Sequence, residues 1–185
     1  HDPAARTYTL TLTQQPALAS AQAQLLPVAM GLVGPDGAAL PLKLEGETEA
    51  GGQRRVLVLG EQSRRWTFVD IEAPPVPSLL QGFSAPVLLD DGLEDSQRLH
   101  LLRHDADAFN RWEGAQNLAL ARLLAALPPD AAPLALDAPY LDALRALIDE
   151  PALDPAFKAL ALTPPSEQLV AERCAEVDPQ RIHAI

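Results

Sequence analysis

Two histidines, spaced to share one face of a helix, stand out in the segment HLLRHDADAFNRW from His100 to Trp112. His100 and His104 are four residues apart, and side chains with that spacing can bind zinc together. In zinc peptidases with an H-E-x-x-H motif, the Glu after the first histidine acts as general base. Leu101 takes that position here. The residue that would carry out the chemistry is therefore missing.

Three acidic residues follow the histidines: Asp105, Asp107 and Glu113. If Asp107 is the N-cap of a new helix, these acids lie beyond the end of the helix that carries the histidines. We interpret His104 and Arg103 as residues of a last helical turn, where donors complement free carbonyl groups. Asp105 and Asp107 are typical of the start of the next helix. The segment predicts a junction between two helices rather than a metal site.

The remaining candidates for chemistry are weaker. Ser84 in GFSAP does not meet the G-x-S-x-G pattern of a nucleophile turn, so we expect a serine in a loop between strands. An acidic patch lacks the spacing of a calcium loop, and we expect a linker and a helix start there; it consists of Asp90, Asp91, Glu94 and Asp95. The residues themselves therefore predict no catalytic residue and no metal ligand.

Composition bounds the class of protein. The chain has 185 residues, 48% hydrophobic and 21% charged, which is enough for one large domain or two small ones. Its net charge of −11 repels phosphate backbones, so we expect no nucleic-acid partner. No apolar run approaches the roughly 20 residues that span a bilayer. The lone Cys174 excludes an internal disulfide and fits a reducing compartment, so we expect a cytoplasmic location.

Residues 1–89 predict a β domain. Apolar and threonine residues alternate from Thr7 to Thr13, as in a half-buried strand. We expect a hairpin around GPDG, a second pair of strands, and a proline-rich edge segment. The ranges are Leu26 to Val33 with Ala38 to Leu44, Val56 to Leu59 with Trp66 to Ile71, and Ala73 to Leu89. Six or seven short strands favour a β-sandwich, immunoglobulin-like in type.

Residues 90–185 predict an all-α domain. We expect helices at about Glu94 to His104, from Asp107 as N-cap to Leu127, and at Tyr140 to Asp149, Pro155 to Leu162 and Ser166 to Ala175. On the second helix one apolar stripe is predicted, with Gln116 inside it; it consists of Phe109, Trp112, Leu120, Leu123, Leu124 and Leu127. Short consecutive helices are typical of a bundle or of the first turns of an α-superhelix. The fold class is therefore α+β, with two domains.

Both ends of the chain indicate a fragment. The first residue is His1, and Asp178-Pro179 reads as a helix start with only Gln180 to Ile185 after it. A stub of that length is too short to be stable alone. We therefore expect the residues after about Asp178 to be frayed, or ordered only by packing on a neighbouring molecule.

Several stretches resemble one family. LLQGFSAPVLL (Leu79 to Leu89) and LLRHDADAFNRWEGAQNLA (Leu101 to Ala119) resemble bacterial aminopeptidase N, the membrane alanyl aminopeptidase type of zinc metallopeptidase. TYTLTLTQQ, WTFVDIEAPPVPSLL and ALIDEPALDPAFKALALTPPSE follow the same order, so the likeness spans nearly the whole chain. Ala108 departs from the proline that related members often place after the capping Asp.

The resemblance implies a position within a longer protein. That family has an N-terminal β domain, a thermolysin-like catalytic domain, a small β-sandwich and a helical superhelix. This chain resembles the third part and the start of the fourth. The family's H-E-x-x-H and G-x-M-E-N motifs belong to the catalytic domain and are absent here; Met30, the one methionine, is in no such motif.

The resemblance therefore carries over no catalytic and no metal residue. Zinc would be bound in the catalytic domain of the parent protein, and this fragment would hold no cofactor. Its partners would be that catalytic domain, in the same polypeptide, and the peptide substrates of the parent. The fragment would brace the catalytic domain and restrict access to its cleft. The residues expected to have structural roles are Phe83, Asp107, Phe109, Trp112 and Gln116.

An independent module that binds another protein through its sandwich and helices is the alternative. An H-E-x-x-H motif a few hundred residues upstream of His1 would decide for the enzyme. A stop or a signal peptide there would favour the module.

Overall fold

The chain forms two units of structure. The computed structural model describes residues 1–15 and 22–185. The first unit consists of His1–Gly92 and His104–Asn110, and the second of Leu93–Arg103 and Arg111–Ile185. The division predicted from the sequence lies between residues 89 and 90. Each unit has its own hydrophobic core and is described by itself.

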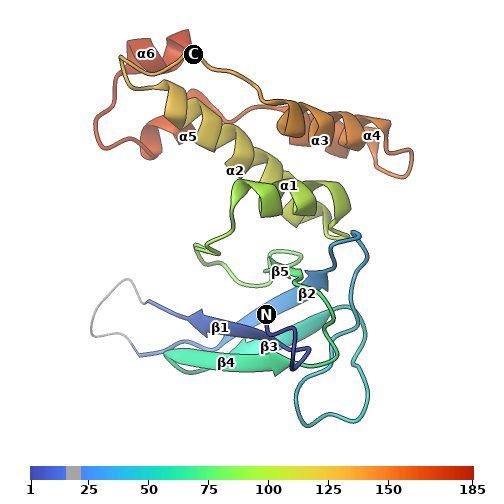
Figure 1. Ribbon diagram of the computed structural model, residues 1–185. Helices are drawn as coiled ribbons and strands as arrows, with labels where there is room; N and C mark the ends of the chain where they lie inside the picture. Colours follow the sequence, from blue (N-terminus) through green and yellow to red (C-terminus); the bar gives the residue numbers. More distant parts are fainter. Residues whose placement is uncertain (16–21) are drawn as a thin grey trace. The chain divides into compact units, whose positions relative to one another are not determined.

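The first unit contains two antiparallel sheets (Figure 1). In one, β1 (Tyr8–Thr13) pairs with β4 (Ser63–Phe68). In the other, β2 (Leu26–Val33) lies between β3 (Arg55–Leu59) and β5 (Val76–Leu79). The predicted β-sandwich is therefore confirmed, and β5 is an edge strand, as the prolines around it indicated.

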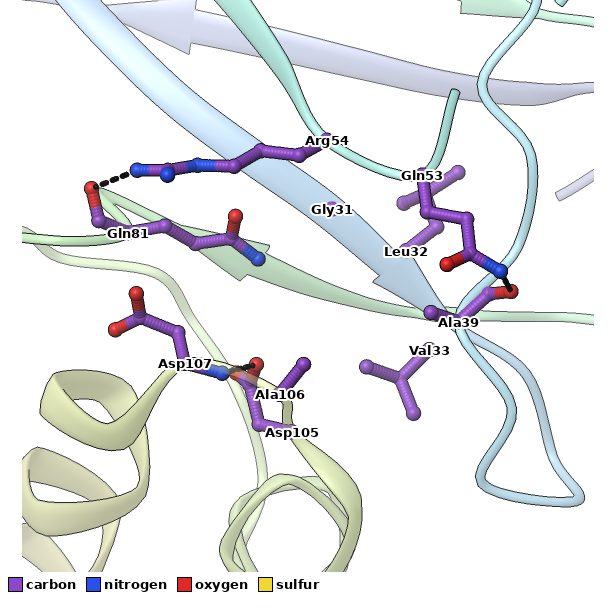
Figure 2. A pocket seen from close by; sticks show the side chains of 10 residues that line it. All are labelled: Gly31, Leu32, Val33, Ala39, Gln53, Arg54, Gln81, Asp105, Ala106 and Asp107. Carbon is purple, nitrogen blue, oxygen red and sulfur yellow. Dashed lines mark hydrogen bonds between the residues drawn. The ribbon is translucent and has the colours of Figure 1, made fainter.

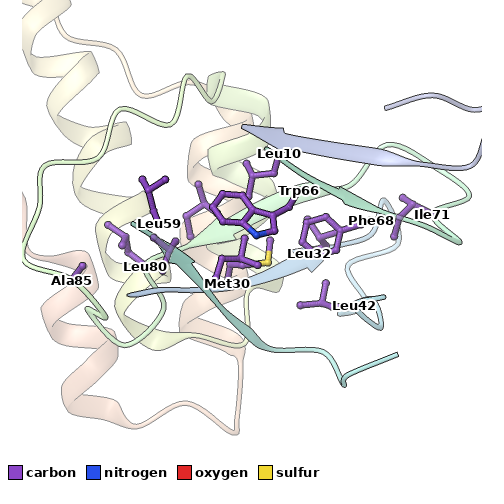
Figure 3. Packing of buried hydrophobic residues seen from close by; sticks show 13 residues of the cluster. Leu10, Met30, Leu32, Leu42, Leu59, Trp66, Phe68, Ile71, Leu80 and Ala85 are labelled. Carbon is purple, nitrogen blue, oxygen red and sulfur yellow. The ribbon is translucent and has the colours of Figure 1, made fainter. Parts of the chain in front are cut away.

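The core of this unit comes from the inward faces of both sheets. Side chains alternate along a strand, so Leu10 and Trp66, opposite each other in β1 and β4, point to the same side. Met30 and Leu32 of β2 and Phe68 of β4 are fully buried. Figure 3 shows these side chains in one cluster, to which loop residues such as Leu42 and Ile71 also contribute.

One predicted pairing, between the strands now called β3 and β4, was wrong. Val56 to Leu59 does not pair with Trp66 to Ile71: β3 pairs with β2, and β4 with β1. The short connection of residues 60–62 crosses from one sheet to the other. Leu57 and Leu59 of one sheet and Trp66 of the other thereby contribute to the same core.

The hairpin around GPDG was half right. The turn forms, with the Gly37 amide donating to the Gly34 carbonyl over 2.9 Å, and the first strand is β2. The expected partner, Ala38 to Leu44, is not a strand, and its bridges Val33–Ala39 and Leu44–Phe68 are isolated ones. Pro41 interrupts it, because proline has no amide to donate to a ladder. This is why the described residues contain five strands and not six or seven.

The second unit is helical. Its helices are α1 (Asp95–His104), α2 (Ala108–Ala126), α3 (Ala138–Asp149), α4 (Pro155–Leu162), α5 (Glu167–Glu172) and α6 (Pro179–Ala184), with the last residue of α1 and the first three of α2 assigned to the first unit. The predicted helices are confirmed to within a few residues at each end. Within the described residues, no helix is long and apolar enough to cross a membrane.

Side-chain caps explain where the short helices begin. Asp137, Asp154, Ser166 and Asp178 each accept a hydrogen bond from a backbone amide in the first turn of the helix that follows. Prolines follow three of these caps, where a missing amide costs nothing.

The apolar stripe predicted on α2 was only partly right. Leu120 packs with Leu123, Leu124 and Leu127 near α5 and α6, but Trp112 belongs to a different cluster, with α1, α3 and α4. The most buried residues of α2 are Ala115 and Leu118, at 1% and 0% exposed, which the stripe omitted. A helix with neighbours on two sides buries two faces, so a single 3.6-residue stripe does not describe it.

The expectation of a frayed end was wrong for the structure as it stands. Ile182 of α6 is 6% exposed and packs against Val170 and Leu120. The Arg181 guanidinium donates to backbone carbonyls at the end of α2, with 2.6 Å to that of Pro128, and also bonds Leu127. Packing and these bonds stabilise a helix too short to persist alone.

Candidate functional site

The two histidines lie on α1, one turn apart, and α1 ends at His104. The ring of His104 lies against Gly37, whose φ of 84° and lack of a side chain the turn requires. Asp107 then accepts a hydrogen bond of 3.0 Å from the Asn110 amide at the start of α2. Across residues 1–15 and 22–185, no three His, Cys, Asp or Glu side chains are grouped so that they could hold a metal ion.

Asp105, directly after His104, belongs instead to a buried polar cluster. Ser78, Gln81, Asp105 and Asn110 are at most 8% exposed. Ser78 pairs with Gly31 across β5 and β2, on the sheet face opposite Met30 and Leu32. We call the four polar residues the Ser78 cluster.

Hydrogen bonds connect the Ser78 cluster. The Ser78 hydroxyl accepts from Gln81 Nε2 at 2.9 Å and from Asn110 Nδ2 at 2.8 Å. Asn110 Nδ2 also donates to the Leu79 carbonyl at 2.9 Å. Asp105 Oδ1 accepts from the Asp107 amide at 2.9 Å. The amide of Asn110 thereby ties the first turn of α2 to strand β5.

Two buried oxygen atoms of the cluster have no hydrogen-bond partner: Asp105 Oδ2 and Asn110 Oδ1. Burial raises the pKa of the Asp105 carboxyl, while the neighbouring Ser78 side chain and the Asp107 amide oppose that rise. A buried acceptor without a donor is costly, so these atoms mark a place where water or another group would be stabilised.

The turn that follows β5 closes the same face of the sheet. Leu80, Gly82 and Phe83 have positive φ angles of 56°, 63° and 54°. This backbone brings the Gln81 amide to the Ala29 carbonyl and the Ser84 hydroxyl to the Ala29 amide, each at 2.9 Å. Ser84 thus replaces a strand residue as hydrogen-bond acceptor, which accounts for the GFSAP sequence without a nucleophile.

The residues expected to be structural lie in both units. In the first, the rings of Phe83 and Phe109 pack with centroids 5.5 Å apart, and Phe83 is 56% exposed. In the second, Trp112 is half-buried in the core that contains Leu102 and Leu118. Gln116 Nε2 donates to the Thr163 carbonyl at the end of α4, over 2.9 Å.

The residues of the acidic patch make separate local contacts. Asp90 Oδ1 accepts from the Gly92 amide at 3.3 Å. Asp95 opens α1 and lies 3.2 Å from Arg122, whose guanidinium also pairs with Asp137 and lies 4.6 Å from the centre of the Tyr140 ring. The arginine that connects α1, α2 and α3 was missed, because nothing in its sequence neighbours distinguishes it from a solvated residue.

A pocket of about 240 Å³ opens beside the Ser78 cluster, within the first unit. Its polar lining consists of Gln53, Arg54, Gln81, Asp105 and Asp107. Figure 2 shows Arg54 and Gln81 along one side of this view and Asp105 and Asp107 along the other. Arg54 Nη2 donates to the Gln81 carbonyl at 3.2 Å. Sequence reasoning missed the pocket, because its residues come from five separate segments of the chain.

Comparison with known families covers the chain in two parts. Residues 1–92 match a family described as a domain of unknown function, DUF3458, with an Ig-like fold. Residues 95–185 match its companion, DUF3458_C, described as a domain of unknown function with ARM repeats. The immunoglobulin-like sandwich and the following helical array are thereby confirmed.

Curated relatives carry a common name. Aminopeptidase N of Escherichia coli K12 is 34% identical over 185 residues, which cover 97% of this chain and 21% of the relative. Aminopeptidase N of Caulobacter vibrioides is 45% identical over 134 residues, covering 69% of this chain and 15% of the relative. That of Haemophilus influenzae is 31% identical over 191 residues, covering 100% and 21%.

A solved structure has the same fold. The crystal structure of Legionella pneumophila aminopeptidase A in complex with aspartic acid matches 99% of this chain with a TM-score of 0.79 and 23% identity, over 20% of that protein. This chain therefore spans about a fifth or less of the relatives it matches.

Proposed function

This chain belongs to the aminopeptidase N family, and on that basis we propose that it is a non-catalytic segment of a zinc-dependent aminopeptidase. The whole protein releases N-terminal amino acids from peptides, with zinc bound outside this segment. The observation that carries the proposal is the extent of the match: 97% of this chain, but 21% of the relative. The H-E-x-x-H and G-x-M-E-N motifs are absent from these 185 residues, which agrees with catalysis elsewhere.

The segment's role is to brace the catalytic domain of the same polypeptide and to limit which peptides reach its cleft. Such a role requires rigidity. It is supported by Asn110, which bonds both Ser78 and Leu79, and by the tight turn that satisfies both backbone groups of Ala29. Elements held by buried hydrogen bonds have few alternative arrangements. A cytoplasmic location belongs to the same proposal.

The test uses the full-length protein that contains this segment. Asn110→Ala removes the bonds to Ser78 and Leu79 and leaves their partners buried, at a cost of about 1–3 kcal/mol. We expect a lower unfolding temperature and faster cleavage of long peptides relative to an alanyl anilide. Zinc content and anilide turnover should stay unchanged. Asn117→Ala, on the same helix, is the matched control.

Suppose that Asn110→Ala unfolds at the same temperature as the control but loses zinc or anilide turnover. That result would place this segment in the catalytic machinery. An unchanged preference between long and short substrates in a destabilised Asn110→Ala protein would show that the segment does not control access.

A further inference from the structure

Two opposite charges face the same pocket without counterparts. Arg54 is exposed and donates one hydrogen bond, to the Gln81 carbonyl, and within the part of the chain that the structure describes no carboxylate forms an ion pair with it. Asp105 is 3% exposed, and its Oδ2 has no donor. Both residues line the pocket, yet they do not pair with each other. A ligand that carries both a cation and an anion would complement both residues.

A second acidic residue, Asp107, strengthens the preference of the pocket for a cationic group. Asp107 uses Oδ1 to accept the Asn110 amide, which leaves Oδ2 for another donor. An ammonium group has three donors and can bond to two carboxylates at once. A guanidinium group binds a carboxylate through parallel N–H donors.

The volume and the apolar lining of the pocket limit the size and the polarity of the rest of the ligand. About 240 Å³ corresponds to the liquid volume of roughly eight water molecules. Val33, Ala39 and Ala106 supply apolar lining. Gly31 lies at the pocket too, where a Cβ would come within 2.8 Å of Gln81 Nε2, so the space is closely bounded there.

We propose that this pocket binds a free α-amino acid with a small apolar side chain, its ammonium group on Asp105 and Asp107 and its carboxylate on Arg54. The ligand class follows from the charges and the volume. It does not depend on the proposed function, although a free amino acid is also what an aminopeptidase releases.

The test is a titration of the ¹⁵N-labelled chain, followed by NMR, with three small molecules. L-alanine carries both charges, N-acetyl-L-alanine lacks the ammonium group, and L-alaninamide lacks the carboxylate. We expect L-alanine to shift the backbone amides of Gly31 and Asp107 and the side-chain amide of Gln81 in a saturable way. Each blocked analogue should bind at least about tenfold more weakly, because it leaves either the aspartates or Arg54 without a charged partner.

Two variants assign the charges. Arg54→Gln should lower the affinity for L-alanine to that for L-alaninamide and leave the latter unchanged. Asp105→Asn should lower the affinity for L-alanine to that for N-acetyl-L-alanine, and should leave the affinity for N-acetyl-L-alanine unchanged. Arg65→Gln removes an exposed guanidinium from β4 that does not line the pocket, and should change neither. If Asp105→Asn unfolds, Arg54→Gln decides alone, because Arg54 is exposed.

The proposal is overturned if L-alanine causes no saturable shift at these amides. It is equally overturned if L-alaninamide binds as tightly as L-alanine, since the pocket would then be a cation site only, or if Arg65→Gln weakens binding as much as Arg54→Gln.

Discussion

At the scale of single residues, the polar side chains of this chain act by fixing other groups in place. Asn110 connects α2 to β5, Ser84 substitutes for a strand residue opposite Ala29, and Arg122 joins three helices. None of these contacts requires reactive chemistry. Their common property is that each satisfies backbone or charged groups that would otherwise be left unpaired.

The ion pair of Glu47 and Arg55 gives a pH-dependent prediction. The Arg55 guanidinium and the Leu44 amide lower the pKa of Glu47 from 4.5 to about 2. Because the folded-state pKa is the lower one, the pair stabilises the fold above about pH 4.5, and this contribution is lost as the pH falls toward 2. Glu47→Gln should therefore be less stable than the parent chain at pH 7 and equal to it near pH 2. Urea unfolding at both pH values measures this. A constant difference would contradict it.

Leu118 gives a prediction about the helical core. It is fully buried on α2, so Leu118→Ala should destabilise the second unit by about 2–5 kcal/mol. Leu160→Ala is the matched control, because Leu160 on α4 is 56% exposed. Urea unfolding followed by helical circular dichroism compares the two. Similar losses would mean that the buried face of α2 is misassigned.

Among the elements, the short helices depend on the caps at their starts and on the neighbouring elements that pack against them. The caps determine where α3 to α6 begin, and the neighbours determine whether they persist. Helix α6 is the clearest case. Arg181 donates to carbonyl groups that α2 leaves unsatisfied at its end, while Ile182 fills the small core with Val170.

Arg181→Met should therefore release α6. The Ile182 amide, which donates to the Asp178 carbonyl at 3.0 Å, should exchange with solvent faster in this variant. His183→Gln removes an exposed contact with Glu167, and should have a much smaller effect. Hydrogen exchange by NMR compares them. If the Ile182 amide exchanges freely in the parent chain as well, α6 does not persist in solution, as the sequence alone predicted.

Local patterns predicted the elements better than their pairing. Alternation predicted β1, the GPDG turn signal predicted β2, and caps with prolines predicted the helix starts. The pairing of β3 and β4 depended on which core each strand shares, which no local pattern contains. The Ser78 cluster was unpredictable for the same reason: Ser78 and Asn110 are 32 residues apart, and each is unremarkable among its neighbours.

At the scale of the whole molecule, the two units are two parts of one family. An Ig-like sandwich and an ARM-repeat array follow one another in this chain, and aminopeptidase N relatives at 31–45% identity match it over 69–100% of its length. In the function proposed here, neither unit carries out the hydrolysis. Arrays of this kind bury the face of each repeat against the next, which suits a supporting role.

Zinc content and alanyl anilide turnover of this 185-residue chain, measured after dialysis, test whether the segment is non-catalytic. Our account predicts far less than one zinc ion per chain and no turnover above the uncatalysed rate, because the sequence lacks the H-E-x-x-H ligands and base. One tightly held zinc ion per chain, with turnover that a chelator abolishes, would contradict it.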